Sequence, residues 1–458
     1  MTMVDGVTTS LAPMLSDGTS IASLIDRERR AVSARVFTDP GVYRLELRRV
    51  FARAWIAVAH ESEIPNVGDY VLRYIGEDPV IVVRASSGAI KILLNVCSHR
   101  AMGVCRAEAG NARLFQCPYH GWQYDTEGRL VAVTAEQAMY DDGLDRSTLG
   151  LRTARCESCA GWIFGTWDSD APSLEEFLGP IALYMRVAFD RTDGGLVVAG
   201  LPERWVLDAN WKLAADQFAG DAYHTLILHR SMADLGYMAK GDPLAVLRGV
   251  NIGSRRGHHV RLVDLASGTT EGRVRRAADY RDALPGLTPE LMPQLEAHLS
   301  PEELHIARTA PPSTGSVYPN VFWLATKTPP LDGRPSPGLL SFRIVVPRGP
   351  DKMEIMNWAL RERDVPIADG DASVRNAIQT FSISGIWEQD DSEAWVAVQR
   401  ALRGVIGQER WLMYRSVGAP PTDEFPGRTL RGVARDDCQW SAWLAYFEMM
   451  GAGAADGD

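Results

Sequence analysis

The chain has 458 residues, 46% of them hydrophobic and 23% charged, and its 58 acidic and 48 basic side chains give a net charge of −10. This length supports more than one domain core, and the acidic balance argues against general binding of nucleic acids or anionic membranes. The composition excludes collagenous, coiled-coil and largely disordered classes. No apolar run approaches the roughly 18 to 20 residues that a membrane helix needs.

The N-terminal stretch from Met1 to Leu24 is rich in Ser, Thr and Gly and contains neither Lys nor Arg. It lacks the basic and apolar regions of a secretory signal, so we expect a cytoplasmic location. The six cysteines are unevenly spaced, and three of them lie between Cys97 and Cys117. In a reducing compartment such clustering indicates metal or redox chemistry rather than a disulfide framework.

The pattern along the chain predicts a small β-rich unit followed by a larger mixed one. Residues 1–36 predict a helical segment after a loose tail. Short β-rich runs between turns then predict an antiparallel unit, with strand candidates at 70–72, 80–83, 90–96 and 162–164. Pro172 to Glu176 resembles a helix start and marks a transition. Beyond it the strand candidates are 196–200, 316–324, 339–346 and 353–360, and the helix candidates are 203–228, 288–309, 372–403 and 437–450.

These elements predict an α+β fold with three parts. Residues 1–54 form an N-terminal segment that packs on the larger domain. Residues 55–170 form a small antiparallel-β domain, inserted near the N-terminus of the larger domain. Residues 171–458 form that larger domain, in which helices cover an antiparallel sheet.

Two short motifs place four candidate metal ligands in the small domain: Cys97-x-His99 and, after residues 100–116, Cys117-x2-His120. Loops at the tips of two β-hairpins can present these side chains to one centre. Zinc accepts such a set in tetrahedral form, and so does a [2Fe–2S] cluster in which two imidazoles replace two thiolates on one iron. Structural zinc more often uses Cys-x2-Cys pairs, so one Cys and one His per loop favours the cluster.

The other thiols lack such a pattern. Cys105 lies inside the loop between the two motifs, and Cys156 and Cys159 have no matching second pair. We therefore expect them to be buried core residues.

A second candidate metal site follows Asn210, where Asp221, His224 and His229 are close in sequence. Asp221 and His224 share one helical face, but His224 and His229 differ by about 140° on an ideal helix. Both can therefore meet one metal only if the helix breaks between them. Two His and one carboxylate are the donor set of non-haem iron oxygenases. The carboxylate candidates are Asp216 and Asp221 nearby and Asp390 and Asp391 far along the chain.

These motifs resemble those of the large subunits of Rieske non-haem iron ring-hydroxylating dioxygenases, of the naphthalene, biphenyl and polycyclic-arene type. The run from Cys97 to Trp122 resembles their Rieske domain, residues 210–229 resemble their iron-binding helix, and residues 387–391 resemble their third-ligand segment. Two departures stand out. Ala101 occupies a position that is usually Gly, and residues 216–218 read Asp-Gln-Phe instead of Glu-Asn-Phe, although Gln occurs there in biphenyl-type relatives.

The resemblance implies a role for each candidate residue. Cys97, His99, Cys117 and His120 would hold a [2Fe–2S] cluster. His224, His229 and Asp391 would hold a mononuclear Fe(II), with Asp390 as the alternative to Asp391. Asp221 would bridge an iron-ligand His to a Rieske His of the neighbouring subunit. The substrate pocket would include Gln217, Phe218, Phe381 and Trp387.

The resemblance also implies the reaction and the partners. NAD(P)H would supply electrons through a ferredoxin reductase and a ferredoxin, and both atoms of O2 would enter an aromatic ring to give a cis-dihydrodiol. A small beta subunit would complete an α3β3 hexamer. Alternatives are a hydroxylase of aromatic carboxylates such as salicylate or phthalate, a related monooxygenase or demethylase, and a pure electron carrier. The chain length and the second metal motif argue against the carrier. Loops 231–260 and 270–300 are expected to shape the pocket.

Overall fold

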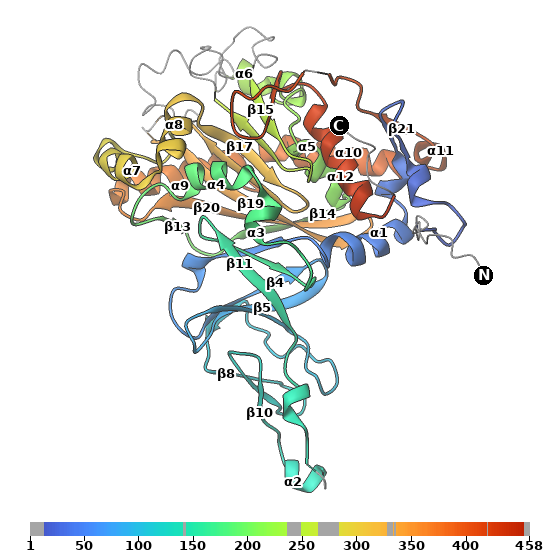
Figure 1. Ribbon diagram of the computed structural model, residues 1–458, viewed down its shortest axis with the longest axis vertical. Helices are drawn as coiled ribbons and strands as arrows, with labels where there is room; N and C mark the ends of the chain where they lie inside the picture. Colours follow the sequence, from blue (N-terminus) through green and yellow to red (C-terminus); the bar gives the residue numbers. More distant parts are fainter. Residues whose placement is uncertain are drawn as a thin grey trace, which may run out of the picture.

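The computed structural model describes residues 13–140, 143–235, 249–263, 284–327, 333, 336–418 and 420–452. A narrow β-rich arm, which contains β8 and β10 and ends at α2, projects from a broad body built on a large sheet (Figure 1). Of the pocket loops expected at 231–260 and 270–300, residues 236–248 and 270–283 lie outside the described residues. No helix among the described residues is both long and apolar enough to cross a membrane.

In the N-terminal segment, residues 13–36 form short elements, so the helix expected there is wrong, and residues 1–12 of that prediction lie outside the described residues. Its strand β2 pairs with β21 near the C-terminus, which attaches the segment to the body. Glu46 of this segment is fully buried and accepts hydrogen bonds from Trp211, Lys212 and Tyr446 of the body. The elements are η1 (Ile21–Leu24), β1 (Ile25–Asp26), β2 (Ala31–Ser33), η2 (Ala34–Phe37), α1 (Pro40–Glu46), η3 (Leu47–Phe51) and β21 (Trp411–Met413).

The small domain contains a seven-stranded antiparallel sheet in the order β3-β12-β11-β6-β5-β4-β7, and the arm carries a three-stranded sheet in the order β10-β9-β8. All four strand candidates of this domain are confirmed. Its elements are β3 (Ile56–His60), η4 (Glu61–Glu63), β4 (Asp69–Ile75), β5 (Asp78–Arg84), β6 (Ile90–Leu94), β7 (Ala109–Asn111), β8 (Leu114–Gln116), β9 (Gln123–Asp125), β10 (Leu130–Ala132), α2 (Glu136–Met139), η5 (Arg146–Thr148), β11 (Thr153–Cys159) and β12 (Trp162–Thr166).

The body is built on an antiparallel sheet in the order β13-β20-β19-β18-β17-β16-β15-β22, with β14 also paired to β20. Two expectations are corrected. Residues 203–207 form a strand rather than the start of a long helix, and 316–324 is a hairpin rather than one strand. The strands are β13 (Leu196–Val198), β14 (Glu203–Leu207), β15 (Val250–Gly253), β16 (His259–Leu262), β17 (Pro312–Val317), β18 (Val321–Thr326), β19 (Leu339–Gly349), β20 (Lys352–Glu362) and β22 (Arg428–Arg431).

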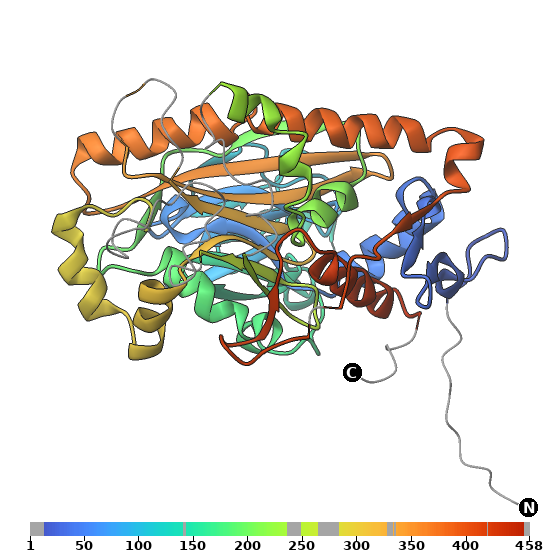
Figure 2. The ribbon, with the colours of Figure 1, turned by 90° about the horizontal axis from the view of Figure 1, so that it is seen from above.

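Helices cover both faces of this sheet, and α9 and α10 run end to end along one of them (Figure 2). The expected helices over 288–309 and 372–403 are each divided in two, the second by residues 382–387. The helices are α3 (Leu174–Leu178), α4 (Ile181–Phe189), α5 (Trp211–Phe218), η6 (His224–Leu226), α6 (Arg230–Asp234), η9 (Pro289–Leu291), α7 (Met292–His298), α8 (Pro301–Thr309), α9 (Ile367–Phe381), α10 (Glu388–Leu402), α11 (Val405–Gln408) and α12 (Asp437–Met449).

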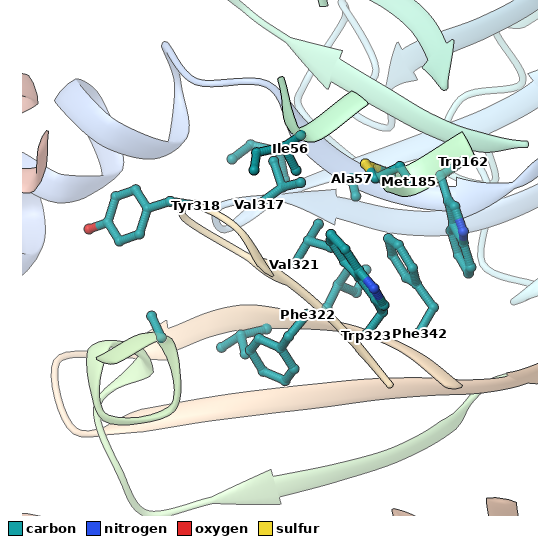
Figure 3. Packing of buried hydrophobic residues seen from close by; sticks show 14 of the residues in the cluster. Ile56, Ala57, Trp162, Met185, Val317, Tyr318, Val321, Phe322, Trp323 and Phe342 are labelled. Carbon is teal, nitrogen blue, oxygen red and sulfur yellow. The ribbon is translucent and has the colours of Figure 1, made fainter. Parts of the chain in front are cut away.

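One hydrophobic core spans the body and the base of the small domain, and a second buried cluster, which includes Cys97, Cys117 and Trp122, lies within the small domain. Strands β3 and β12 lie against β18 and β19, and Trp162 of β12 stacks on Phe342 of β19 (Figure 3). The Asn320 side chain adds two hydrogen bonds to the backbone of Ala57, at 3.3 and 3.1 Å. The base of the small domain is therefore fixed on the large sheet, and the expected α+β architecture is confirmed.

Candidate metal centres

Two loops of the small domain have matching backbone conformations. In the first, Cys97 N–H donates to Met102 C=O at 2.9 Å, and Ala101 N–H donates to Cys97 C=O at 2.9 Å. The second loop repeats both bonds: Cys117 N–H donates to the carbonyl five residues on at 2.8 Å, and Gly121 N–H donates to Cys117 C=O at 3.0 Å. In both loops the residue that donates the second of these bonds has a left-handed backbone, with φ of +59° at Ala101 and +75° at Gly121. Two similar turns thus carry the candidate ligands.

These turns bring the four candidate ligands to one end of the small domain. The Cys97 and Cys117 side chains are buried, and the His99 and His120 ring centroids lie 4.6 Å apart. Trp122 stacks on His99 at 4.8 Å with the planes only 6° apart. Burial raises the pKa of the Cys117 thiol, and the neighbouring Cys97 raises it further.

The surroundings of these side chains fit an iron–sulfur cluster. His99 Nδ1 is buried without a hydrogen-bond partner, so its lone pair is available to a metal. The Tyr124 hydroxyl lies 3.2 Å from Cys97 Sγ and accepts a hydrogen bond from Ser98 N–H at 3.1 Å. Hydrogen bonds to the ligand sulfur atoms tune the potentials of such clusters. Two thiols and two imidazoles match the Rieske donor set.

Of the remaining cysteines of this domain, Cys159 is buried as expected, whereas Cys105 and Cys156 are only half-buried and pack against the edge of the core. The backbone of Cys105 exchanges two hydrogen bonds with the side chain of Asn95, both at 2.8 Å. Cys156 and Cys159 lie on β11, and burial raises the pKa of each thiol to about 12. Such thiols remain protonated at neutral pH and are poor ligands and nucleophiles.

The second candidate site forms where helix α5 ends. Gly220 has a φ of +125°, and a Cβ at this position would lie 3.0 Å from Cβ of Cys438. The chain turns at this glycine, passes through η6, which begins at His224, and reaches His229 just before α6. The expected helix break between the two histidines is therefore confirmed.

This break, together with the start of α10, brings three side chains together. Asp391 Oδ1 lies 3.2 Å from Nε2 of His229 and 3.8 Å from Nε2 of His224. One donor atom from each residue lies within 4.8 Å of the other two, and His229 and Asp391 are buried. Residues far apart in sequence thus form a two-His, one-carboxylate cluster of the kind that binds iron and leaves positions open.

Each histidine has a second carboxylate at its other ring nitrogen. Asp221 Oδ2 lies 3.2 Å from His224 Nδ1, and Asp390 Oδ2 lies 3.3 Å from His229 Nδ1. Burial alone would lower the pKa of His229, but the nearby carboxylates of Asp391 and Asp390 outweigh it and raise that pKa. Carboxylates in such outer positions commonly orient the histidine ligands of metals.

The arrangement of donor atoms in the group of His224, His229 and Asp391 indicates whether a cation can bind there. Asp391 Oδ1 is buried and has no hydrogen-bond partner. When Nδ1 of His229 donates to Asp390, Nε2 carries a lone pair that points toward this oxygen. Two acceptor atoms 3.2 Å apart repel each other unless a metal ion or a proton lies between them. The residues therefore fit a metal ion.

Comparisons with known proteins agree with both donor sets. The chain matches the Rieske [2Fe-2S] domain over residues 54–148 and the ring hydroxylating alpha subunit (catalytic domain) over residues 197–429. Biphenyl dioxygenase subunit alpha of Metapseudomonas furukawaii is 35% identical, across 84% of this chain and 82% of that protein. The N,N-dimethyl phenylurea N-demethylase subunit alpha of a Sphingobium strain is 32% identical, across 94% and 95%.

Similarity to a solved structure points the same way. The naphthalene 1,2-dioxygenase from Rhodococcus sp., solved with indole bound, is 38% identical and superposes with a TM-score of 0.82, covering 93% of this chain and 95% of that chain. The chain belongs to the alpha subunits of Rieske non-haem iron ring-hydroxylating dioxygenases. The cofactors of this family are a Rieske [2Fe–2S] cluster and a non-haem iron.

The aromatic residues expected in the pocket of this alpha subunit occupy two places. The Trp387 ring lies 4.9 Å from that of His229 and 5.8 Å from that of Phe381, so these rings border the cluster. Phe218 stacks on Phe322 at 3.8 Å. The amide oxygen of Gln217, the fourth expected pocket residue, accepts a hydrogen bond from the Trp395 indole at 2.8 Å.

Asp216, which the sequence offered as a possible iron ligand, lies outside the group formed by His224, His229 and Asp391. It accepts hydrogen bonds from Trp443 at 2.8 Å and Gln439 at 3.3 Å, both on α12. Burial raises the pKa of Asp216 to about 7, and the charge of Asp221 contributes in the same direction. Asp216 thus joins α5 to the C-terminal helix α12.

Sequence reasoning missed Arg343, a buried arginine on β19. It forms an ion pair with Glu388, donates to the Phe381 carbonyl and contacts Asn357 Oδ1 at 3.3 Å. These bonds hold the connection between α9 and α10. This connection places Asp391 beside His224 and His229. The available signal was a single charged residue within the apolar run 339–346.

Proposed function

We propose that this alpha subunit hydroxylates a neutral biaryl or polycyclic arene to a cis-dihydrodiol. The observation that carries the proposal is the convergence of His224, His229 and Asp391 in a chain that also has a Rieske donor set. The relatives named for biphenyl and naphthalene dioxygenation support the substrate class. They do not favour the alternative of salicylate or phthalate hydroxylation.

Each donor set has a proposed occupant. Cys97, His99, Cys117 and His120 hold the [2Fe–2S] cluster, and His224, His229 and Asp391 hold Fe(II). When bound, the cluster supplies single electrons and the iron activates O2 for addition to the ring. The paired ligand loops keep the two thiols buried, and the Nε2 atoms of His224 and His229 face Asp391 while Asp221 and Asp390 lie at their Nδ1 atoms.

The aromatic residues position the substrate. Trp387 and Phe381 present stacked faces beside His229, which suit a flat neutral ring. Arg343, a buried cation 5.7 Å from the Phe381 ring, is already bonded to Glu388 and to the Phe381 carbonyl, so it offers no unpaired charge to a substrate carboxylate. Holding the ring in one pose fixes which carbon atoms are hydroxylated.

Asp221 is proposed to connect two copies of the chain. It accepts hydrogen bonds from the backbone N–H groups of Tyr223 at 2.7 Å and His224 at 3.2 Å, which fix its carboxylate beside the His224 ring. The His224 interaction lowers the pKa of Asp221 although burial opposes this. A fixed, ionised carboxylate can accept a further hydrogen bond from a Rieske histidine of a neighbouring copy, such as His120.

The proposed assembly is an α3β3 hexamer in which three copies contact head to tail, with a small beta subunit, a ferredoxin and a ferredoxin reductase as partners. The relatives are themselves named as alpha subunits, which supports a second type of subunit. NAD(P)H acts through these redox partners rather than at this chain.

Product analysis tests the proposal. The alpha subunit is co-expressed with a beta subunit, ferredoxin and reductase from a biphenyl pathway and supplied with biphenyl, naphthalene, phenanthrene, salicylate and N,N-dimethyl phenylurea under ¹⁸O2. We expect cis-dihydrodiols with two labelled oxygens from the neutral arenes. Demethylation of the urea with no dihydrodiol from any arene would contradict the proposal and favour the activity named for the Sphingobium relative.

A further inference from the structure

Two neighbouring carboxylates at the start of α10 hold one imidazole by its two nitrogens. Asp391 Oδ1 lies 3.2 Å from Nε2 of His229, and Asp390 Oδ2 lies 3.3 Å from Nδ1 of the same ring. Adjacent residues of a helix point in directions about 100° apart, so one helical turn reaches both edges of the ring. The two acidic residues are thus not equivalent alternatives.

We propose that Asp390 is a positioning residue that fixes the ring orientation and the tautomer of His229, with Asp391 alone on the metal side. This inference rests on the proposed iron site. An ionised carboxylate only accepts hydrogen bonds, so the Asp390 contact places the imidazole proton on Nδ1. Nε2 then keeps its lone pair on the side of Asp391, where His224 Nε2 also points.

The side chains of Asp390 and His229 differ in their exposure to solvent. The His229 side chain is only 3% exposed, so its ring has no water to replace a lost partner, whereas the Asp390 side chain is 33% exposed. Substitution of Asp390 therefore removes a partner of His229 without opening a cavity in the core. This makes the role of Asp390 measurable in a folded protein.

Asp390 also differs from Asp221, which occupies the matching position at His224. Asp221 is held by two backbone N–H groups, whereas the His229 ring is the hydrogen-bond partner found for Asp390 among the described residues. Asp221 is thus held by its own turn, whereas the contact of Asp390 is with the histidine ring. We expect the Asp390 variants to change metal binding first.

The test measures Fe(II) binding directly. Asp390→Ala, Asp390→Asn and Asp391→Ala are compared with wild type by Fe(II) competition with a chelator and by the visible d–d spectrum after Co(II) substitution. Glu393→Ala is the matched control because it removes a negative charge from an exposed position on the same helix. The visible spectrum of the Rieske cluster reports that each variant is folded.

We expect Asp390→Ala to weaken Fe(II) binding about 10- to 100-fold and to alter the Co(II) spectrum, as loss of an outer carboxylate typically does. Asp390→Asn should recover part of the affinity because its amide oxygen still accepts the Nδ1 proton. Glu393→Ala should match wild type, and Asp391→Ala should lose the metal.

Two results would overturn the inference. One is Asp390→Ala with wild-type affinity and an unchanged Co(II) spectrum. The other is a loss of metal as complete as in Asp391→Ala, which would make Asp390 a ligand. If Asp391→Ala itself keeps wild-type Fe(II), the proposed iron site fails, and that outcome is distinct from either of these.

Discussion

Trp162 of the small domain stacks on Phe342 of the large sheet, with the ring centroids 3.3 Å apart and the planes inclined by 10°. Both side chains are fully buried. This contact joins the domain that carries Cys97, His99, Cys117 and His120 to the large sheet of the body. The position of the Cys97 and Cys117 loops relative to the body therefore depends on the packing of buried aromatic side chains.

Trp162→Ala should destabilise the protein by about 3–5 kcal/mol because it leaves a large cavity between the two sheets. Urea unfolding followed by circular dichroism and by the visible cluster absorbance measures this, with the exposed Leu201→Ala as control. Because Trp162 belongs to the core shared by the body and the base of the small domain, the circular dichroism midpoint should move to lower urea. Cys97 and Cys117 lie in a separate buried cluster, so the visible absorbance of the iron–sulfur cluster shows whether that part unfolds together with the core. An unchanged circular dichroism midpoint would contradict the role of this contact.

Ala101→Gly should stabilise the first ligand loop by about 0.5–1 kcal/mol because Ala101 has a left-handed φ of +59° that glycine adopts without strain. The rate of cluster loss on heating measures the effect. The opposite change in the matching loop, Gly121→Ala, should accelerate loss, because its Cβ would lie 2.2 Å from Thr134 Oγ1. Equal rates for the two variants would show that backbone strain does not limit cluster retention.

His120→Ala should remove the Rieske visible spectrum and leave the iron of the body in place, because the two donor sets share no residue. Iron, acid-labile sulfide and zinc are determined on the same sample. Wild-type protein should contain iron with sulfide, and about one iron per chain should remain in the variant. Two zinc ions per chain in wild type would instead support the tetrahedral zinc alternative.

Asp221→Asn should retain both metals and a reducible cluster yet lose most product formation, about 100-fold or more, because the amide cannot replace the ionised carboxylate between two histidines. Single-turnover reoxidation of the reduced cluster, measured with and without substrate, separates this effect from poor folding. Near-normal turnover with saturating reduced ferredoxin would eliminate the bridging role, as would a fully active monomer.

Asp216→Asn should change how stability depends on pH. The pKa of Asp216 is about 7 in the folded chain, against 3.8 for an ordinary Asp. Between pH 4 and 7 the unfolded chain loses this proton while the folded chain keeps it, so stability falls as pH rises through this window. The Asn variant cannot titrate and should gain about 1–4 kcal/mol relative to wild type between pH 4 and 8. The free energy of unfolding is measured by urea titration of both proteins across this pH range. If it changed with pH in the same way for both, Asp216 would not be a buried, protonated acid in the folded chain.

The sequence by itself determined the local features of both sites. Cys97-x-His99 and Cys117-x2-His120 lie within short turns, and the spacing of His224 and His229 already required a break in the helix. Features of this kind depend on a few neighbouring residues, whose geometry the backbone limits to a small set of conformations. The antiparallel strands of the small domain were predicted for the same reason.

Only the tertiary structure decided the relationships between distant segments. It turned residues 203–207 into a strand, because they pair with β20, and it placed Asp390 and Asp391 at opposite nitrogens of His229. It also stacked Trp162 on Phe342. Such contacts join residues more than 100 positions apart, and each depends on burial and pairing across the whole core, which local sequence patterns do not contain.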